Sequence, residues 1–266
     1  MLLLGNDKRR KRTLSTQTII DLYEQGLSTE EIGVKANVSA RYVRMLLNKN
    51  NVMLRPHGSW KRKYSVNEDY FKTWSNNMAY ILGFFFADGM VARDAQIISF
   101  SQKEKGILEN IRDEMQSNHP IIQNKDTGVY ILNINSKIMR TDLITLYDLM
   151  PNKARQIKFP QVPKQYLSHF IRGYFDGDGH VKYEKYFVNI VGGSKQFMLT
   201  LRDHIENAGF KTKFVDYKTD FRVYVSGRKT LKQFSNWLYK NKGLYLMRKY
   251  NIFMQEKLSM EQLEEK

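Results

Sequence analysis

The chain has 266 residues, and its 43 Lys and Arg outnumber its 27 Asp and Glu to give a formal net charge of +16. That excess favours a polyanionic partner, either nucleic acid or an anionic membrane. The absence of cysteine excludes a disulfide scaffold, a thiolate zinc finger and a cysteine nucleophile. The longest apolar run, residues 78–87, is half as long as the roughly 20 residues of a membrane span, so we expect a cytoplasmic protein without membrane contact.

The positive charge is concentrated at the start of the chain. Residues 1–66 hold 13 Lys and Arg and 5 Asp and Glu, so a quarter of the chain carries half of the net charge. We expect a basic tail over residues 1–13 and a basic linker over residues 52–70. The linker contains three consecutive cations that are expected to follow a phosphate backbone: Lys61, Arg62 and Lys63.

Residues 14–51, between the two basic segments, have the pattern of three short helices. Apolar residues at helical spacing predict a helix over 18–25, which Gly26 ends. Ser28 and Glu31 form a capping box that starts a second helix, and Ser39 is an N-cap for a third helix over 40–47.

This three-helix segment resembles the helix-turn-helix units of DNA-binding proteins. In that arrangement the third helix enters the major groove. Arg41 and Arg44 would then reach base edges or phosphates, and Lys49 would reach the backbone. The alternative interpretation is a small helical packing module without a nucleic-acid role.

The rest of the chain is an internal duplication. Residues 81–89 and 171–179 share the pattern apolar-x-Gly-aromatic-Phe-x-small-Asp-Gly at an offset of 90. Residues 130–137 and 221–228 match at an offset of 91. A near-constant offset over such a distance indicates two copies of one unit. We expect the copies to occupy residues 71–160 and 161–266.

Each copy has the same expected order of elements, a helix, two strands, a helix, two strands and a final helix. The alternation of apolar and polar residues in 221–226 predicts a sheet with one buried face. The fold class is therefore α+β, a tandem αββαββα core with antiparallel sheets behind a small all-α domain. The expected strands lie near 91–101, 120–135, 181–191 and 211–226, and the expected middle helices near 104–116 and 195–208.

The two motifs carry a resemblance to a known family. Ile81-Leu-Gly-Phe-Phe-Phe-Ala-Asp-Gly89 and Ile171-Arg-Gly-Tyr-Phe-Asp-Gly-Asp-Gly179 resemble the signature helices of single-chain LAGLIDADG homing endonucleases. The likeness covers roughly residues 66–255. It departs from the family at Phe86, where Asp is frequent, but that position is not the metal-binding one. The resemblance implies a monomer with internal pseudo-twofold symmetry and outward sheet faces that bind double-stranded DNA.

Small residues four apart on each motif helix predict that the two helices pack closely. The pairs are Gly83 with Ala87, and Gly173 with Gly177. Small side chains at this spacing allow two helix backbones to approach each other. Asp88 and Asp178 would then lie at the same end of the pair, near the pseudo-twofold axis.

Two adjacent carboxylates repel each other unless a cation lies between them. Mg²⁺ prefers oxygen ligands of this kind, and scissile phosphates can complete its coordination. The expected reaction is metal-dependent hydrolysis of one phosphodiester in each strand. The resemblance adds the backbone carbonyls of Ala87 and Gly177 as metal contacts. It also implies that Mn²⁺ substitutes for Mg²⁺, and that Ca²⁺ supports binding without cleavage.

The resemblance also implies a lysine after the last helix of each copy, near each metal site. Lys153 and Lys249 fit that position, with Lys158 and Arg248 as neighbouring competitors. The outward strand faces are expected to contact the major groove. The expected contacts are Arg93, Gln96, Ser99, Lys182, Lys185, Asn189, Arg222 and Tyr224.

Three functions remain open on the sequence. The first is a site-specific double-strand DNA endonuclease that promotes mobility of its own intron or gene in a prokaryotic, phage or organellar host. The second is a maturase that binds intron RNA, and the third is a non-catalytic DNA-binding regulator. The intact Asp pair favours the first. We expect no protein-splicing element, because cysteine is absent and the last residues contain no asparagine.

Overall fold

The computed structural model describes residues 11–55, 63–151 and 154–265. Contacts between residues divide the chain into two compact units, Met1–Tyr64 and Ser65–Lys266. None of the helices in the described part of the chain has the length and apolarity that a membrane crossing requires.

In its described residues, the first unit consists of three short helices around a small apolar core. Each helix has a serine N-cap whose hydroxyl accepts a backbone N–H, and Ser28 forms a full capping box with Glu31. Asn37 adopts the left-handed conformation that ends the second helix. The helices are α1 (Thr16–Glu24), α2 (Thr29–Ala36) and α3 (Ala40–Lys49), and their core includes Ile19, Ile32, Val43 and Leu47.

The second unit contains two repeats of one αββαββα pattern, as the sequence predicts. The first repeat is α4 (Asn76–Asp88), β1 (Gly89–Val91), β2 (Ile97–Gln102), α5 (Lys105–Glu114), β3 (Ile121–Gln123), β4 (Tyr130–Asn135) and α6 (Lys137–Tyr147). The second is α7 (Leu167–Asp178), β5 (Gly179–Lys182), β6 (Phe187–Gly192), α8 (Lys195–Asn207), β7 (Lys213–Asp216), β8 (Phe221–Ser226) and α9 (Arg228–Tyr239). Two further helices follow, α10 (Met247–Phe253) and α11 (Met260–Glu264). The α+β fold class is confirmed.

Both sheets are antiparallel and have the same strand order, β1-β2-β4-β3 and β5-β6-β8-β7. Corresponding residues hold corresponding places, since Ser99 lies opposite Asn133 and Asn189 lies opposite Tyr224. One face of each sheet is buried under helices, because apolar residues alternate along the central strands. The buried residues of these strands include Ile98, Phe100, Leu132, Ile134, Val188, Ile190, Val223 and Val225.

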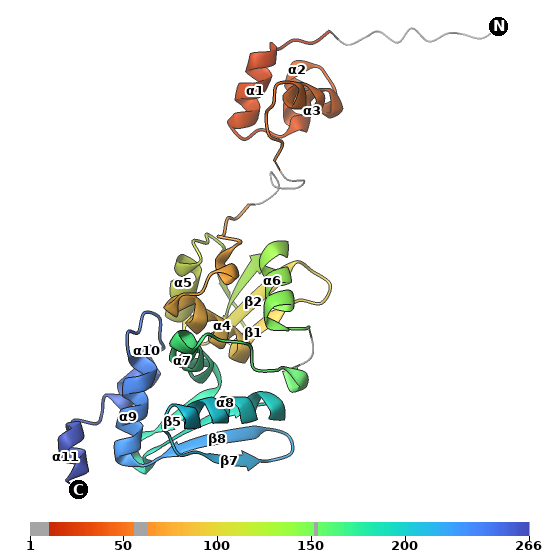
Figure 1. Cartoon of the computed structure of the whole chain (residues 1–266). Helices are drawn as coiled ribbons and strands as arrows, with labels where there is room; N and C mark the ends of the chain where they lie inside the picture. The colour runs from red at the N-terminus through yellow and green to blue at the C-terminus, as the bar shows by residue number, and fades with distance from the viewer. Residues whose placement is uncertain (1–10, 56–62, 152–153, 266) are drawn as a thin grey trace. The chain divides into compact units, whose positions relative to one another are not determined.

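Helices α4 and α7 lie side by side between the two sheets (Figure 1). Residues 78–86 of α4 and 169–176 of α7 are buried without interruption. A helix that is buried on every side belongs in a protein core rather than at its surface. This pair therefore joins the two repeats through one continuous apolar core.

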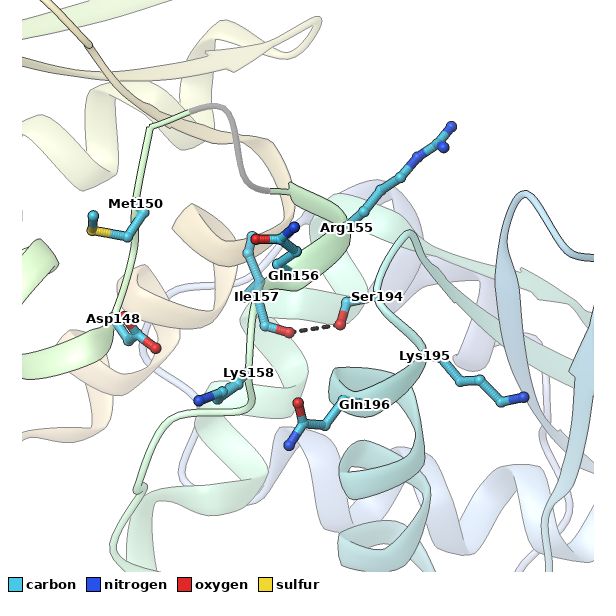
Figure 2. Close-up of a pocket in the computed structure, with 9 residues that line it drawn as sticks. All are labelled: Asp148, Met150, Arg155, Gln156, Ile157, Lys158, Ser194, Lys195 and Gln196. Carbon is cyan, nitrogen blue, oxygen red and sulfur yellow. Dashed lines mark hydrogen bonds between the residues drawn. The ribbon is translucent and has the colours of Figure 1, made fainter.

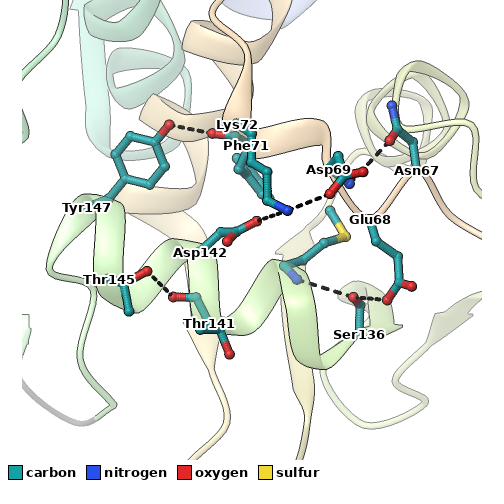
Figure 3. Close-up of polar contacts among 11 residues, drawn as sticks. Asn67, Glu68, Asp69, Phe71, Lys72, Ser136, Thr141, Asp142, Thr145 and Tyr147 are labelled. Atoms are coloured by element: carbon teal, nitrogen blue, oxygen red, sulfur yellow. Dashed lines mark hydrogen bonds and ion pairs between the residues drawn. The ribbon is translucent and has the colours of Figure 1, made fainter. Parts of the chain in front are cut away.

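The segment before α4 is attached to α6 by polar contacts (Figure 3). Tyr147 donates its hydroxyl hydrogen bond to the carbonyl of Phe71 at 2.6 Å, and Ser136 donates to Glu68 at 2.5 Å. Lys72, in the 3-10 turn η2 (Tyr70–Lys72), pairs with Asp69 of the same segment at 2.5 Å and with Asp142 of α6 at 3.9 Å. These contacts fix the chain where it enters the first repeat.

Glu256 fixes the end of the chain against the second repeat. Its carboxylate accepts hydrogen bonds from Arg228 Nε at 2.6 Å, from the Tyr183 hydroxyl at 3.0 Å and from the Leu258 N–H at 3.0 Å. The Arg228 guanidinium is the main cause that lowers the pKa of Glu256 from 4.5 to about 2.

Glu256→Gln should remove part of the acid sensitivity of this unit. Because the pKa is lower in the folded chain, the stabilisation is present above pH 4.5 and is lost as pH falls toward 2. Urea unfolding at several pH values should therefore show a wild-type advantage at neutral pH that shrinks in acid. Glu264→Gln, which removes an exposed ion pair with Lys229, is the control and should change little. If wild type and Glu256→Gln lose stability equally in acid, the result would contradict a lowered pKa of Glu256.

Candidate active site

The backbones of α4 and α7 touch at two glycines. A Cβ atom added to Gly83 would lie 2.0 Å from the carbonyl oxygen of Phe170, and one added to Gly173 would lie 1.9 Å from that of Tyr80. No side chain fits at such distances, so glycine is required at both positions. In the structure, Gly83 and Gly173 each lie against the backbone of the facing helix.

The same packing brings the C-terminal ends of the two helices together. A Cβ atom added to Gly177 would lie 2.3 Å from the Cβ of Ala87 and 3.2 Å from Oδ2 of Asp88. Asp88 and Asp178 are the last residues of α4 and α7. The structure thus places both carboxylates, Ala87 and Gly177 at one end of the helix pair.

Both aspartates are in an environment that disfavours their negative charge. Burial raises the pKa of Asp178 to about 7, with a further contribution from the charge of Asp88 and an opposing one from Lys249. Burial also raises the pKa of Asp88, again opposed by Lys249. The C-terminal end of a helix adds partial negative charge to this region. The arrangement concentrates anionic oxygen and would be stabilised by a cation.

The donor set fits a hard divalent ion such as Mg²⁺. It consists of carboxylate oxygens and of backbone carbonyls at the last turn of each helix, all oxygen ligands. In the described residues no group of three or more His, Cys, Asp or Glu side chains could hold a metal ion. Two carboxylates leave coordination positions for water and phosphate, as expected where the substrate completes the site.

Gln102 is a site residue that the sequence analysis missed. Its Nε2 donates to Oδ2 of Asp88 at 3.1 Å, and the neighbouring Ser101 hydroxyl donates to the Asp88 carbonyl at 3.4 Å. The antiparallel register places Gly89 opposite Phe100, so the residues after Phe100 lie beside Asp88. The pairing of β1 with β2 is what reveals this contact. A comparison of the two repeats does not reveal it, because Gly192 occupies the equivalent position in the second repeat.

Lys249 lies close to the aspartates but points at the backbone. Its Nζ donates to the carbonyls of Phe175 at 2.6 Å and Asp176 at 2.7 Å, and lies 3.5 Å from that of Gly177. The residue is 4% exposed, and burial lowers its pKa to about 8. The positively charged Lys249 amine therefore offsets the partial negative charge at the C-terminal end of α7.

The lysine predicted for the first repeat, Lys153, lies outside the described residues. Its competitor Lys158 is exposed and lines a pocket of about 490 Å³ between the connection after α6 and the start of α8 (Figure 2). In that pocket the Ser194 hydroxyl donates to the Ile157 carbonyl at 2.6 Å and ties this connection to α8.

Several of the predicted DNA contacts need correction. Arg93 and Gln96 lie in the turn between β1 and β2, not on a strand face. Ser99 and Asn189 do lie on the outward face, but they are 6% and 7% exposed. Their cross-strand neighbours cover them, and the Ser99 hydroxyl donates to Asn133 at 2.5 Å.

The other predicted contacts stay accessible where the structure describes them. Lys182 is an exposed strand residue, and Lys185 is exposed in the 3-10 turn η5 (Tyr183–Lys185). Arg222 is partly exposed and pairs with Asp220 at 2.7 Å. The remaining accessible or partly accessible candidates are Tyr224, Lys63, Arg41, Arg44 and Lys49. Lys61 and Arg62 lie outside the described residues.

The family of LAGLIDADG-like domains matches residues 165–236. The probable translation initiation factor IF-2 of Methanocaldococcus jannaschii is 28% identical over 170 residues, which are 59% of this chain and 14% of that protein. This chain therefore matches only a small part of that relative's length.

Two solved structures are similar at low identity. Mesophilic variants of the homing endonuclease I-DmoI share 15% identity, with a TM-score of 0.47 over 67% of this chain and 99% of theirs. Full-length DUF199/WhiA from Thermatoga maritima shares 15% identity, with a TM-score of 0.47 over 73% of this chain and 66% of its own. Residues 165–236, which match the family of LAGLIDADG-like domains, include α7, the β5-β6-β8-β7 sheet and α8.

Proposed function

We propose that this protein is a sequence-specific endonuclease that cuts both strands of duplex DNA in a Mg²⁺-dependent reaction. The observation that carries the proposal is the pair of carboxylates, Asp88 and Asp178, at the ends of two helices in backbone contact. Burying two like charges together lowers stability, and such arrangements are more common at functional sites than elsewhere.

Each part of the site has a proposed role. Asp88, Asp178 and the carbonyls of Ala87 and Gly177 would hold the metal, which when bound would supply an activated water and stabilise the leaving 3′ oxygen. Gln102 orients the Asp88 carboxylate through its hydrogen bond. Lys249 supplies positive charge beside the phosphate. The net charge of +16 supports attraction of a polyanionic substrate.

The first test is cleavage of a randomised duplex library with Mg²⁺ by the purified chain and by the Asp88→Asn/Asp178→Asn double variant. Recovered ends that share one long site, absent with the double variant, would support a specific endonuclease and reveal its target. Duplex binding in Ca²⁺ without any cleavage in Mg²⁺ would instead favour the regulator. Binding to structured intron RNA in preference to duplex DNA would favour the maturase.

We further propose that the N-terminal unit binds DNA as a helix-turn-helix. Arg41 and Arg44 are exposed on α3, and Ser39 caps the helix that presents them. In the full chain, Arg41→Gln/Arg44→Gln should weaken duplex binding. It should also reduce the slope of log affinity against log salt by about 0.9 for each phosphate that is no longer neutralised.

The salt titration needs a control that removes a positive charge from the same unit but away from α3. Lys35→Gln serves this purpose, because Lys35 is exposed at the end of α2 rather than on α3. It should leave the slope almost unchanged. An equal reduction of slope per charge removed in both variants would indicate a general charge effect and contradict the helix-turn-helix assignment.

A further inference from the structure

The two halves of the site differ at equivalent positions of α4 and α7. Three pairs of residues related by the 90-residue offset each combine a polar residue with an apolar one. Pairs of this kind break the pseudo-twofold symmetry of an otherwise repeated core. The pairs are Tyr80 with Phe170, Arg172 with Leu82, and Asp176 with Phe86.

The polar members form one buried network, in which the Arg172 guanidinium lies over the Tyr80 ring, 5.2 Å from its centre. The Tyr80 hydroxyl donates to Oδ2 of Asp176 at 2.9 Å, and the backbone N–H of Leu246 donates to the same oxygen at 2.7 Å. Arg172 donates to the carbonyl of Leu244 at 3.0 Å and to that of Leu238 at 2.7 Å. Tyr80, Arg172 and Asp176 are fully buried. The network therefore holds the chain segment that leads into α10.

Lys249 follows directly after this anchored segment. Leu246 is the N-cap of α10, so the hydrogen bond to Asp176 fixes the start of the helix that carries Lys249. On the outer side, Arg248 pairs with Glu104 of the first repeat at 2.8 Å. The amine of Lys249 is thereby held at the last turn of α7, next to Asp178.

Two of the apolar members, Phe86 and Phe170, belong to a buried aromatic cluster. The ring of Phe86 lies 5.5 Å from that of Phe170 and 5.8 Å from that of Phe197. Phe159 packs on Phe170 at 5.0 Å. Lys158 is the residue 91 positions before Lys249, the offset that relates the later parts of the repeats, and it is exposed.

We propose that Tyr80 and Asp176 are positioning residues that hold Lys249, and that the half of the site containing this network cuts its DNA strand first. This inference rests on the proposed endonuclease function. A cation held in place by buried hydrogen bonds needs no reorganisation during the reaction, whereas an exposed lysine must be ordered. The two strands should therefore be cut at different rates, with a nicked intermediate.

The test uses the full chain and its selected target, with a different fluorophore on each strand, in single-turnover cleavage with Mg²⁺. The strand whose cleavage Lys249→Met slows more is the one that depends on Lys249, and we call it the dependent strand. Tyr80→Phe should slow the same strand by about tenfold and change the other strand by less than about twofold. It gives α4 the residue that α7 has at the equivalent position, Phe170.

Tyr147→Phe is the matched control, because it removes a buried hydroxyl whose hydrogen bond, to Phe71, lies outside the network. It should leave the ratio of the two strand rates unchanged. Thermal unfolding and duplex affinity in Ca²⁺ separate impaired positioning from impaired folding. If Tyr80→Phe does not fold, the wild-type time course and Lys249→Met still decide the strand order.

Equal strand rates in the wild type, or equal slowing of both strands by Lys249→Met or Tyr80→Phe, would overturn this inference and leave the endonuclease intact. A wild-type chain that cuts neither strand would overturn the proposed function and this inference together. Accumulation of one nicked product, with the dependent strand cut first and selectively slowed by Tyr80→Phe, is the expected result.

Discussion

Gly173→Ala should lower the free energy of unfolding of the second unit by about 3 kcal/mol or more, at or above the upper end of the usual cost of overpacking a core. The new methyl group would lie 1.9 Å from the carbonyl oxygen of Tyr80. Neither partner can rotate away, since both belong to helix backbone, so the two helices must separate. Separation would expose apolar surface from a core that spans both repeats. Urea unfolding of the full chain, followed by tryptophan fluorescence, measures the change.

Two further substitutions, one at the same helix contact and one at an open position, test whether the effect comes from the close approach of the helices. Gly83→Ala should have a similar cost, because its methyl group would lie 2.0 Å from the carbonyl oxygen of Phe170. Gly106→Ala is the control, since Gly106 lies in α5 and has open space where the methyl group would be. It should stabilise the chain by about 0.5–1 kcal/mol, because alanine favours helix. Equal effects at Gly173 and Gly106 would contradict the close helix contact.

Close packing was predictable because glycine spacing is a local signal that repeats at a constant offset. The order of helices and strands followed from the same duplication, and the structure confirms it. The burial of Ser99 and Asn189 could not be predicted, because it depends on which side chains of neighbouring strands lie opposite them. Strand pairing sets that register, and alternation along one strand does not reveal it.

The surroundings of the aspartates were harder to predict than the aspartates themselves. Gln102 reaches Asp88 across a strand register, and the carboxylate of Asp176 accepts a backbone N–H 70 residues later in the chain. Such contacts join residues that no periodicity links. Lys249 was predicted by resemblance, but its hydrogen bonds to the carbonyls of α7 were not. Sequence patterns thus identify which residues carry charge, while their orientation depends on tertiary packing.

Asp178→Asn and Asp88→Asn should each lower the cleavage rate by at least about 10³-fold, because each removes a charged metal ligand from the proposed site. Asparagine keeps the size of the side chain, so duplex affinity in Ca²⁺ should change far less than the rate. Single-turnover cleavage of the selected target measures the first quantity, and a binding titration measures the second. Gln102→Ala, which removes the hydrogen bond to Asp88 but keeps both carboxylates, should slow cleavage less than either aspartate variant.

The stability of the same variants separates a functional role from a structural one. The pKa of Asp178 is about 7 in the folded chain, above its ordinary 3.8, so ionisation opposes folding as pH rises through that range. At pH values above 7 without metal, Asp178→Asn should therefore unfold at the same temperature as wild type or higher. A helix-capping or other structural role for Asp178 requires the opposite, a lower unfolding temperature. Abolished cleavage together with retained or increased stability would show that the chain keeps this carboxylate for its reaction and not for its fold.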